Sequence, residues 1–550
     1  MATWNLADLF EQTAAAVPDR LAVTSPLGDR TYCELDDNAS AFARHLVDSG
    51  VSPGEHVAVL SWNRIEWLEA MIGCFKAGVA PVNVNYRYVD VELTYLLDDS
   101  DAVAIVCEPD FLDMARRVRT DLPLVRQTIV LDGPSAGDAV MGALGPGERA
   151  WSEVVSSGEM SSAAMPTRSP DDRYILYTGG TTGMPKGVLW RQEDIFLGAM
   201  TSLVEPESAD EALDAIVPER APWLVTSPLM HGNGQWNSLR PLLAGNGVSL
   251  WTRRHFDPEG VIRQAAADRA QLLVLIGDGM ARPFADTLRA MVSEGEAPDL
   301  SSVAAIASGG AILSPVVKQE LADLLPETLI VDGFGASETG GNGALVGTGD
   351  GGAPRFQMKP DTAVLDDDNR PMEPGTGITG RLARTGHIPL GYHKDPAKTA
   401  ATFPTDAQGR RWAVPGDAAR LEADGTITVF GRGSNCINTG GEKVFPEEVE
   451  SKIKAHPDVL DAFVLGRPDD RFGQRVAAVI ARRPGSDTEL DDVRAFLRDH
   501  LAGYKLPKEA VFVEAMSYTG PGKPDYKWAR AQFDADPNHA NATNEEEVAS

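Results

Sequence analysis

The stretch from residue 174 to residue 188 constrains the fold of this chain more than any other. The apolar run 174–177 predicts a short buried strand, and Gly179, Gly180 and two later glycines leave backbone N–H groups unshielded directly after it. Hydroxyls come from Thr178, Thr181 and Thr182. Lys186 adds a point charge suited to a polyphosphate. A strand followed by such a loop indicates a phosphate-binding loop.

Two other interpretations of this loop compete with that one. A Walker loop has Gly immediately before its Lys and Ser or Thr after it, whereas Lys186 stands between Pro185 and Gly187. Composition alone would favour an ordinary Gly- and Thr-rich surface turn. The residue order, Tyr-Thr-Gly-Gly-Thr-Thr-Gly-Met-Pro-Lys-Gly over 177–187, resembles instead the signature loop of the adenylate-forming superfamily, which includes acyl-CoA synthetases and luciferases. The superfamily usually has Ser where Gly179 stands.

Length, charge and cysteine usage exclude several classes of protein. A chain of 550 residues is too long for one compact core, so at least two domains are expected. The net charge of −30 argues against nucleic-acid partners and a basic membrane-docking face. The four cysteines lack metal-type spacing, and neither a signal peptide nor an integral membrane segment is expected. We therefore expect a cytoplasmic protein, with a homodimer left open.

Apolar runs of strand length alternate with helical periodicity before and after the phosphate-binding loop. Strands are predicted at 57–60, 102–107, 223–227, 248–251, 272–276 and 303–307, and helices at 65–77 and 92–97. Asp257-Pro258 and Ser314-Pro315 predict helix starts, because each pairs a capping residue with proline at the first helical position. This alternation predicts a parallel sheet.

The residue composition and the pattern of predicted elements change after Gly340 and again at about Gly433. Clusters of Gly, Pro and Asp around the runs 362–365 and 426–430 predict a β-rich subdomain, and a compact α+β pattern begins at about Gly433. The last residues mix Asp, Asn and Ala with a run of Glu, which predicts disorder. We therefore predict an α/β protein. Residues 1–432 form a large domain with parallel α/β sheets and a β-rich subdomain, 433–532 a small mobile α+β domain, and 533–550 a disordered acidic tail.

A second motif, Gly-Phe-Gly-Ala-Ser-Glu-Thr over 333–339, follows a strand-like run. Alone it would be a tight turn. Beside the phosphate-binding loop it resembles the second motif of the superfamily. The resemblance implies that Phe334, where Tyr is common, stacks on adenine beside Gly335, that Ser337 contacts the nucleotide, and that Glu338 helps to hold Mg²⁺. A hard cation neutralises the phosphates of ATP, which would otherwise repel an attacking carboxylate.

Further residues gain a function only from the resemblance, because isolated Asp, Arg and His are usually surface or structural residues. It implies that Asp417 and Arg432 hold the ribose, that Gly309 and Gly310 edge the adenine and acyl pockets, and that His231 lines the acyl pocket. Met230, Trp236 and Met280 suggest that this pocket is large and apolar.

The segment 431–450 resembles the superfamily's hinge and the start of its mobile domain. The resemblance places Gly440 and Gly441 at the tunnel for the CoA thiol and makes Lys443 a cofactor-binding residue. Ser434 replaces the usual hinge Asp, and Asn438 replaces a frequently basic residue. Hinge energetics and pantetheine contacts therefore do not carry over. Lys523, in Thr-Gly-Pro-Gly-Lys-Pro, matches the lysine of the adenylation step, against the alternative of a solvated lysine beside a flexible turn.

The resemblance covers about residues 5–530 and implies an ATP-dependent acid–thiol ligase, an acyl-CoA synthetase that forms AMP. A hydrophobic carboxylic acid, ATP and CoA would give acyl-CoA, AMP and pyrophosphate through an acyl-adenylate, with Lys523, Glu338 and His231 in catalytic roles. Several stretches look most similar to actinobacterial ligases for steroid side-chain and fatty acids. Two alternatives stay open: an adenylating enzyme without CoA, such as a luciferase or an acyl-AMP ligase that loads a carrier protein, and a non-catalytic nucleotide sensor.

Overall fold

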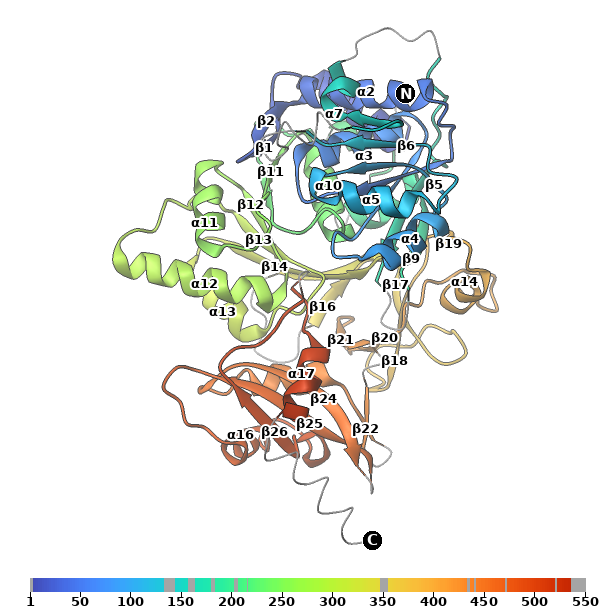
Figure 1. Ribbon diagram of the computed structural model, residues 1–550. Coiled ribbons are helices and arrows are strands. Elements are labelled where there is room, and N and C mark those ends of the chain that lie inside the picture. Colours follow the sequence, from blue (N-terminus) through green and yellow to red (C-terminus); the bar gives the residue numbers. More distant parts are fainter. Residues whose placement is uncertain are drawn as a thin grey trace.

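The computed structural model describes residues 3–132, 144–156, 164–179, 184–201, 206–214, 216–346, 355–432, 436–439, 442–469, 472–519 and 522–535. A large N-terminal part, coloured blue to yellow, lies above a smaller orange and red C-terminal part (Figure 1). The strands of these residues form four sheets. The predicted α/β fold with a smaller α+β C-terminal domain is confirmed.

The first sheet is entirely parallel, as the sequence predicts. Its order is β4-β3-β5-β6-β7, and each neighbouring pair is parallel. β3 and β5 are buried along their whole lengths, which is typical of a parallel sheet covered on both faces. The elements are β3 (His56–Leu60), α3 (Ile65–Lys76), β4 (Ala80–Asn83), α4 (Asp90–Asp99), β5 (Ala102–Cys107), η1 (Pro109–Phe111), α5 (Leu112–Arg119), β6 (Gln127–Val130), β7 (Glu148–Ala150) and α7 (Trp151–Ser156).

The second sheet joins the predicted parallel strands to the predicted β-rich subdomain. Its order is β17-β18-β20-β21-β16-β15-β14-β13-β12-β10-β11-β1-β2. The pairs from β1 through β11, β10, β12 and β13 to β14 are parallel, and those from β14 to β17 are antiparallel. The subdomain is thus an antiparallel extension of the parallel sheet. Its strands are β1 (Leu21–Ser25), β2 (Gly28–Thr31), β10 (Trp223–Val225), β11 (Val248–Leu250), β12 (Leu272–Leu275), β13 (Ala305–Ser308), β14 (Leu329–Ala336), β15 (Gly340–Val346), β16 (Arg355–Met358), β17 (Thr362–Leu365), β18 (Thr379–Arg384), β20 (Asp417–Leu421) and β21 (Ile427–Arg432).

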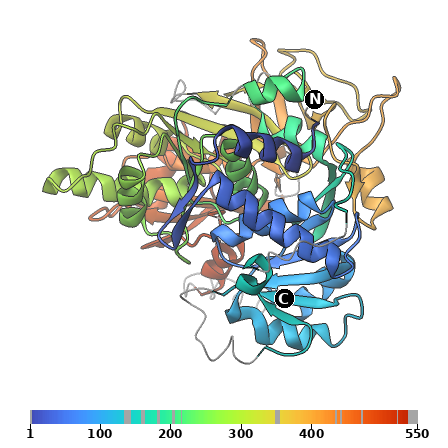
Figure 2. The ribbon, with the colours of Figure 1, turned by 90° about the horizontal axis from the view of Figure 1, so that it is seen from above.

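The helices of the large domain cover these sheets, and in the view from above the yellow-green ones project to one side (Figure 2). Asp257 caps α11 as predicted, since its side chain accepts the N–H of Gly260. Ser314 precedes α13, but its hydroxyl makes no cap bond; its own N–H donates to Asp278 instead. The remaining helices are α1 (Leu6–Ala16), α2 (Tyr32–Asp48), α8 (Gln192–Ile195), η2 (Phe196–Met200), α9 (Ala209–Asp214), α10 (Gly232–Leu243), α11 (Pro258–Ala267), α12 (Gly277–Glu294), α13 (Pro315–Leu324) and α14 (Pro396–Thr402).

The third sheet, β19-β9-β8, carries the phosphate-binding loop. β8 (Arg173–Thr178) contains the predicted strand 174–177, and β9 (Lys186–Arg191) returns antiparallel to it. The short β19 (Gly391–Tyr392) pairs with β9 from the other side.

The C-terminal domain is built on the fourth sheet, β23-β22-β25-β24, with β26 beside β25. The predicted tail 533–550 needs a correction at its start: α17 continues through Ala535 because Phe533 is buried against the sheet. The rest of that tail lies outside the described residues. The described residues include no helix long and apolar enough to cross a membrane. The elements are β22 (Ile437–Thr439), β23 (Glu442–Val444), α15 (Pro446–Ile453), β24 (Val459–Asp469), β25 (Gly473–Arg482), α16 (Leu490–Leu497), η4 (Gly503–Lys505), β26 (Glu509–Val513) and α17 (Tyr526–Ala535).

Candidate active site

The phosphate-binding loop closes a β-hairpin whose base is held by a buried amide. Thr178 and Lys186 lie opposite each other in the β8–β9 ladder. Asn83, at the end of β4, accepts the N–H of Tyr177 at 2.7 Å and donates to the carbonyls of Tyr177 and Met230 at 2.8 and 2.6 Å. One side chain thus ties the loop to the segment that carries His231. Gly179 has open space where a Cβ would stand, whereas Gly180, Thr181 and Thr182 lie outside the described residues.

Lys186 is directed by a carboxylate that the sequence does not single out. Its ammonium group pairs with Asp395, which also caps α14 by accepting the N–H of Lys398 at 2.8 Å. Lys186 holds the pKa of the Asp395 carboxyl below its usual range. The Asp395-Pro396 pair indicates a helix start, like Asp257-Pro258, but no local pattern could show that its partner lies 209 residues away.

The second motif is a hairpin rather than the single tight loop that we expected. Residues 333–336 belong to β14, the chain turns at 337–339, and β15 begins at Gly340. Antiparallel pairing with β15 extends the strand through Ala336, because Gly335 has no side chain to keep the two backbones apart. A Cβ at Gly335 would lie 2.1 Å from the carbonyl oxygen of Gly340.

The turn of this hairpin lies against the strand that leaves the phosphate-binding loop. The indole N–H of Trp190 in β9 donates to the carbonyl of Ser337 at 3.1 Å. The buried carboxylate of Glu338 accepts the hydroxyl of Tyr392 at 2.7 Å, and Tyr392 lies opposite Val188 of β9. Two contacts thus place Glu338 beside the strand that begins at Lys186.

The loop after β13, which carries Gly309 and Gly310, contacts both β14 and α10. A Cβ at Gly309 would lie 3.3 Å from the carbonyl oxygen of Gly333 and 3.4 Å from Nδ2 of Asn233 in α10. The Asn233 amide donates to the Gly309 carbonyl at 3.2 Å, and Gly310 has a φ of 87°, which favours glycine. The glycine pair therefore lies where α10, β13 and β14 meet. Asn233 and Asn83 cannot be predicted from the sequence, because a buried amide has no local pattern of its own.

The two residues expected to hold the ribose lie opposite each other along the backbone of the sheet, and the ring expected to stack on adenine packs against the subdomain. Asp417 in β20 lies directly opposite Arg432 in β21. The ring of Phe334 packs against Phe356, with centroids 4.7 Å apart, so it rests partly on the hydrophobic cluster of the subdomain. Gly440 and Gly441 lie outside the described residues, and for Lys443 the structure describes the backbone in β23 alone.

His231 immediately precedes α10, between the phosphate-binding loop and the C-terminal domain. Its Nε2 is shielded from solvent and has no hydrogen-bond partner among the described residues. Burial, together with the positive charges of Lys523 and Arg87, lowers the pKa of His231 to about 4. A neutral imidazole is therefore the form present near pH 7. Met230 and Met280, which the sequence predicts to line an apolar pocket, are both buried.

Lys523 lies on a tight loop that reaches from the C-terminal domain to the large domain. Tyr518 and Pro524 pair across the base of this loop, and beside that pair the Thr519 N–H donates to the Lys523 carbonyl at 2.7 Å. A Cβ at Gly522 would lie 3.0 Å from the carbonyl oxygen of Ile276, so the loop packs on the start of α12. The side chain of Lys523 is exposed, and its charge acts on His231.

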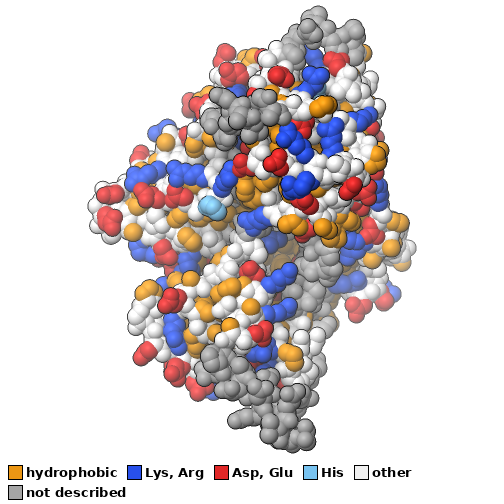
Figure 3. All heavy atoms as spheres, viewed as in Figure 1, with side chains coloured by type: hydrophobic (Ala, Val, Ile, Leu, Met, Phe, Trp, Pro, Cys, Tyr) orange, Lys and Arg blue, Asp and Glu red, His pale blue; other side chains and the backbone are white. Residues whose placement is uncertain are grey.

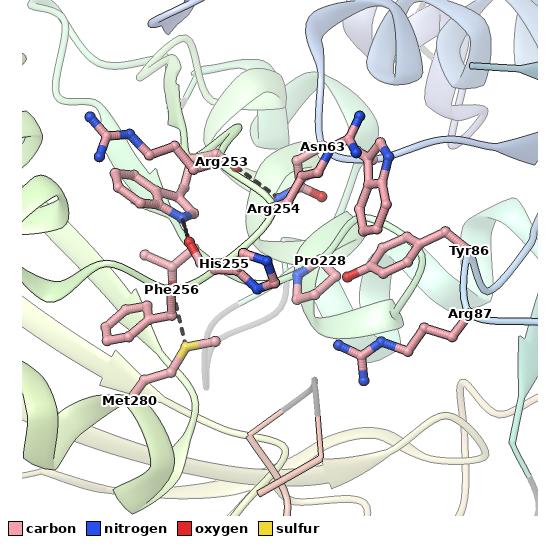
Figure 4. A pocket seen from close by; sticks show the side chains of 12 residues that line it. Asn63, Tyr86, Arg87, Pro228, Arg253, Arg254, His255, Phe256 and Met280 are labelled. Atoms are coloured by element: carbon pink, nitrogen blue, oxygen red, sulfur yellow. Dashed lines mark hydrogen bonds between the residues drawn. The ribbon is translucent and has the colours of Figure 1, made fainter. Parts of the chain in front are cut away.

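A pocket with a cationic and aromatic lining lies close to His231 (Figure 4). It includes Met280 and Pro228, whose carbonyl accepts the N–H of His231 at 3.0 Å. Arg253 and Arg254 are committed to Asp257 and Asp110, whereas Arg87 lies 5.7 Å from the centre of the Tyr86 ring. On the face shown in Figure 3, the molecule is hollowed between the large and the small domain. The pocket is lined by Trp62, Asn63, Tyr86, Arg87, Thr226, Pro228, Trp251, Arg253, Arg254, His255, Phe256 and Met280.

The carboxylate of Glu338 fits a metal ion that is bound together with a polyphosphate. Within the described ranges, no group of three or more His, Cys, Asp and Glu side chains could hold a metal ion by itself. Mg²⁺ usually keeps several waters and binds one or two carboxylates together with substrate phosphates. The single buried carboxylate of Glu338 beside the phosphate-binding loop suits that mode of binding.

Comparisons with known proteins agree with this arrangement. The family described as AMP-binding enzyme matches residues 10–392, and the AMP-binding enzyme C-terminal domain matches residues 448–523. A 3-oxocholest-4-en-26-oate–CoA ligase of Rhodococcus rhodochrous is 44% identical over 96% of both chains. The medium-chain acyl-CoA ligase Mig of Mycobacterium avium is 41% identical over 94% of this chain and 96% of its own.

Solved structures share the fold at lower identity. The anthranilate CoA ligase AuaEII in complex with anthranoyl-AMP has a TM-score of 0.81 at 22% identity and covers 97% of this chain and 98% of its own. ATP-bound MatB from Rhodopseudomonas palustris has a TM-score of 0.78 at 24% identity, over 96% and 99% of the two chains. The chain belongs to the AMP-binding enzyme family. It is an acid–thiol ligase that forms AMP.

Proposed function

We propose that the protein joins a hydrophobic carboxylic acid to CoA through an acyl-adenylate. The observation that carries the proposal is that the phosphate-binding hairpin lies beside the buried carboxylate of Glu338 and is tied through Asn83 to the segment of His231, on which the charge of Lys523 acts. A non-catalytic nucleotide sensor would not need Lys523 at this place. The relatives named as CoA ligases, at 41–44% identity over nearly the whole chain, support the same activity.

The reaction consists of two displacements, the first at the α-phosphorus of ATP and the second at the acyl carbon. In the first, a carboxylate oxygen of the acid attacks the α-phosphorus of ATP, and pyrophosphate leaves. In the second, the sulfur of CoA attacks the acyl carbon, AMP leaves with the bridging oxygen, and the thiol proton goes to solvent. The chain supplies no nucleophile, so its contribution is positioning and charge neutralisation.

The residues divide these tasks between the nucleotide and the acid. Lys186, beside Thr178, Gly179, Gly180, Thr181 and Thr182, binds the phosphates, and Glu338 holds Mg²⁺, which neutralises the charge that would repel the acid. Phe334, Gly335, Ser337, Gly309 and Gly310 border the base, and Asp417 and Arg432 hold the ribose. Lys523 stabilises the charge that develops at the α-phosphate. Gly440 and Gly441 flank the path of the thiol, and Lys443 binds the cofactor.

The acid is a steroid side-chain acid or a medium- or long-chain fatty acid. Buried Met230 and Met280, with the half-buried Trp236, support an apolar pocket beside His231, and a neutral His231 suits such a pocket. The names of the relatives, which include steroid and medium-chain acids, support the same range. The four free cysteines support a reducing cytoplasmic location.

The proposal is tested by product analysis with a panel of acids and two thiol acceptors. A steroid side-chain acid, acids of eight to sixteen carbons and acetate are each supplied with ATP and Mg²⁺, and with either CoA or a carrier protein that bears phosphopantetheine. We expect AMP and acyl-CoA from the bulky acids with free CoA. A preference for acetate would contradict the apolar pocket, and product on the carrier protein alone would favour the acyl-AMP ligase.

A further inference from the structure

A buried chain of charges crosses from the large domain to the C-terminal domain. Asp278, at the start of α12, accepts the ammonium group of Lys454 at 3.1 Å through Oδ2, while its Oδ1 accepts the N–H of Ser314 at 2.8 Å. Lys454 follows α15 of the C-terminal domain and also pairs with Asp461 in β24 at 3.0 Å. One lysine therefore joins a carboxylate of each domain.

The same chain of contacts continues to the loop that carries Lys523. The second carboxylate oxygen of Asp461 accepts the hydroxyl of Tyr518. Tyr518 forms the base of the Lys523 loop by pairing with Pro524. A Cβ at Gly279 would lie 2.9 Å from the Gly522 carbonyl oxygen and 3.0 Å from the Tyr518 ring. Gly279 thus packs against the Lys523 loop. Asp278, the residue before it, is connected to the base of the same loop through Lys454 and Asp461.

Burial makes this connection sensitive to the orientation of the domains. Asp278, Lys454 and Asp461 are 4%, 6% and 5% exposed. Burial alone would lower the pKa of Lys454, but Asp461 and Asp278 hold it well above its usual range. A buried charge persists only while it is paired and hydrogen-bonded. Any rotation that separates the domains must break the Asp278–Lys454 pair and hydrate both groups.

We propose that Asp278 and Lys454 are positioning residues for adenylation, which hold the Lys523 loop in the site through Asp461 and Tyr518. The inference rests on the proposed function, because it assigns a task to Lys523. Asp278 and Lys454 do not touch the reacting atoms. They fix the domain orientation in which Lys523 acts, and they release it when the C-terminal domain rotates for the thiol step.

A second bridge between the domains supplies a matched control. Arg483 in the C-terminal domain lies 3.4 Å from Glu320 of α13, and its side chain is 38% exposed. Glu320 is also shared with Arg282 and Arg289 of its own domain. A pair at this distance with an exposed arginine contributes little to stability. Arg483→Met therefore removes a contact between the domains without removing a buried charge.

The test compares both half-reactions in Asp278→Asn, Lys454→Met, the double variant and Arg483→Met. Adenylation is followed by carboxylate-dependent exchange of pyrophosphate into ATP, and the thiol step by conversion of supplied acyl-adenylate and CoA. A loop displaced by about 1 Å costs on the order of 10²-fold in rate. For Asp278→Asn, whose amide oxygen still accepts the Ser314 N–H, we expect a fall in the adenylation kcat of about 10- to 100-fold, with the KM for ATP and the thiol step nearly unchanged.

Three results distinguish this inference from its alternatives. Adenylation by the double variant close to that of Asp278→Asn alone would show that the two residues act as one pair. Equal losses in both half-reactions, or the same loss in Arg483→Met, would overturn the inference and indicate a general structural role. If the unaltered enzyme shows no carboxylate-dependent exchange, the proposed function fails instead. Should Lys454→Met not fold, Asp278→Asn against Arg483→Met still decides the question.

Discussion

Replacing Glu338 by Gln removes the negative charge of this side chain and keeps its size and its hydrogen-bond acceptor. Its Oε1 accepts the hydroxyl of Tyr392 at 2.7 Å in a buried setting. The amide oxygen of Gln can accept the same hydroxyl, so a charge-assisted hydrogen bond becomes a neutral one. That change costs about 1 kcal/mol of unfolding free energy. The protein should therefore stay folded.

The loss in catalysis should be larger than the loss in stability. Glu338 would act through the Mg²⁺ that it holds, and a preorganised positive charge that offsets the charge developing at the reacting phosphate contributes on the order of 10²-fold in rate, or about 2.7 kcal/mol. We expect Glu338→Gln to lower pyrophosphate exchange by about that factor at limiting Mg²⁺, and by less as Mg²⁺ rises. The difference in size means that unfolding cannot account for the defect.

The assay is an Mg²⁺ titration of exchange, with thermal unfolding measured on the same samples. Tyr392→Phe is the matched control, because it removes the hydroxyl and keeps the carboxylate; we expect its exchange to stay within about tenfold of the unaltered enzyme. Turnover of Glu338→Gln that equals the unaltered enzyme at limiting Mg²⁺ would refute the assignment of Glu338.

Three further outcomes follow from the site. Lys523→Ala should slow adenylation by about 10²–10³-fold, or about 3–4 kcal/mol, and leave conversion of supplied acyl-adenylate unchanged; comparable losses in both steps would indicate a structural lysine. His231 has a folded pKa of about 4 against an unfolded value of 6.5, so its protonation favours the unfolded state and stability falls as pH drops below 6.5. Between pH 7.5 and pH 5 this amounts to about 2 kcal/mol, and denaturant unfolding of His231→Gln should lack that part of the decline. Arg87→Ala should raise the pKa of His231, because it removes one of the two positive charges that lower it; an unchanged pKa in an NMR titration of the imidazole would contradict that effect.

Elements with strong local patterns were predictable. The runs 57–60 and 102–107 became the parallel strands β3 and β5, and the apolar run 174–177 became part of the antiparallel β8, because a short continuous apolar run is itself the mark of a buried strand. Ser314 shows the limit of such patterns. It stands before Pro315 at a helix start, yet its N–H is taken by Asp278, a partner 36 residues away.

Contacts between distant segments were beyond the reach of the sequence. Asn83 joins the phosphate-binding loop to the segment of His231, and Asp395 directs Lys186, but neither has a local pattern that names its partner. The motif over 333–339 reads as a turn, and pairing with β15 makes most of it a strand. Asp278 and Lys454 form a pair across 176 residues. Sequence motifs therefore identify the candidate functional residues. The residues that position them are identified only in the structure.

The central claim is that a carboxylate oxygen attacks the α-phosphorus of ATP before the thiol reacts. A bulky acid labelled with ¹⁸O in its carboxylate is converted to acyl-CoA, and AMP and pyrophosphate are analysed by mass spectrometry. We expect one ¹⁸O atom in AMP and none in pyrophosphate. Label in pyrophosphate or in inorganic phosphate, or AMP without label, would contradict the acyl-adenylate route.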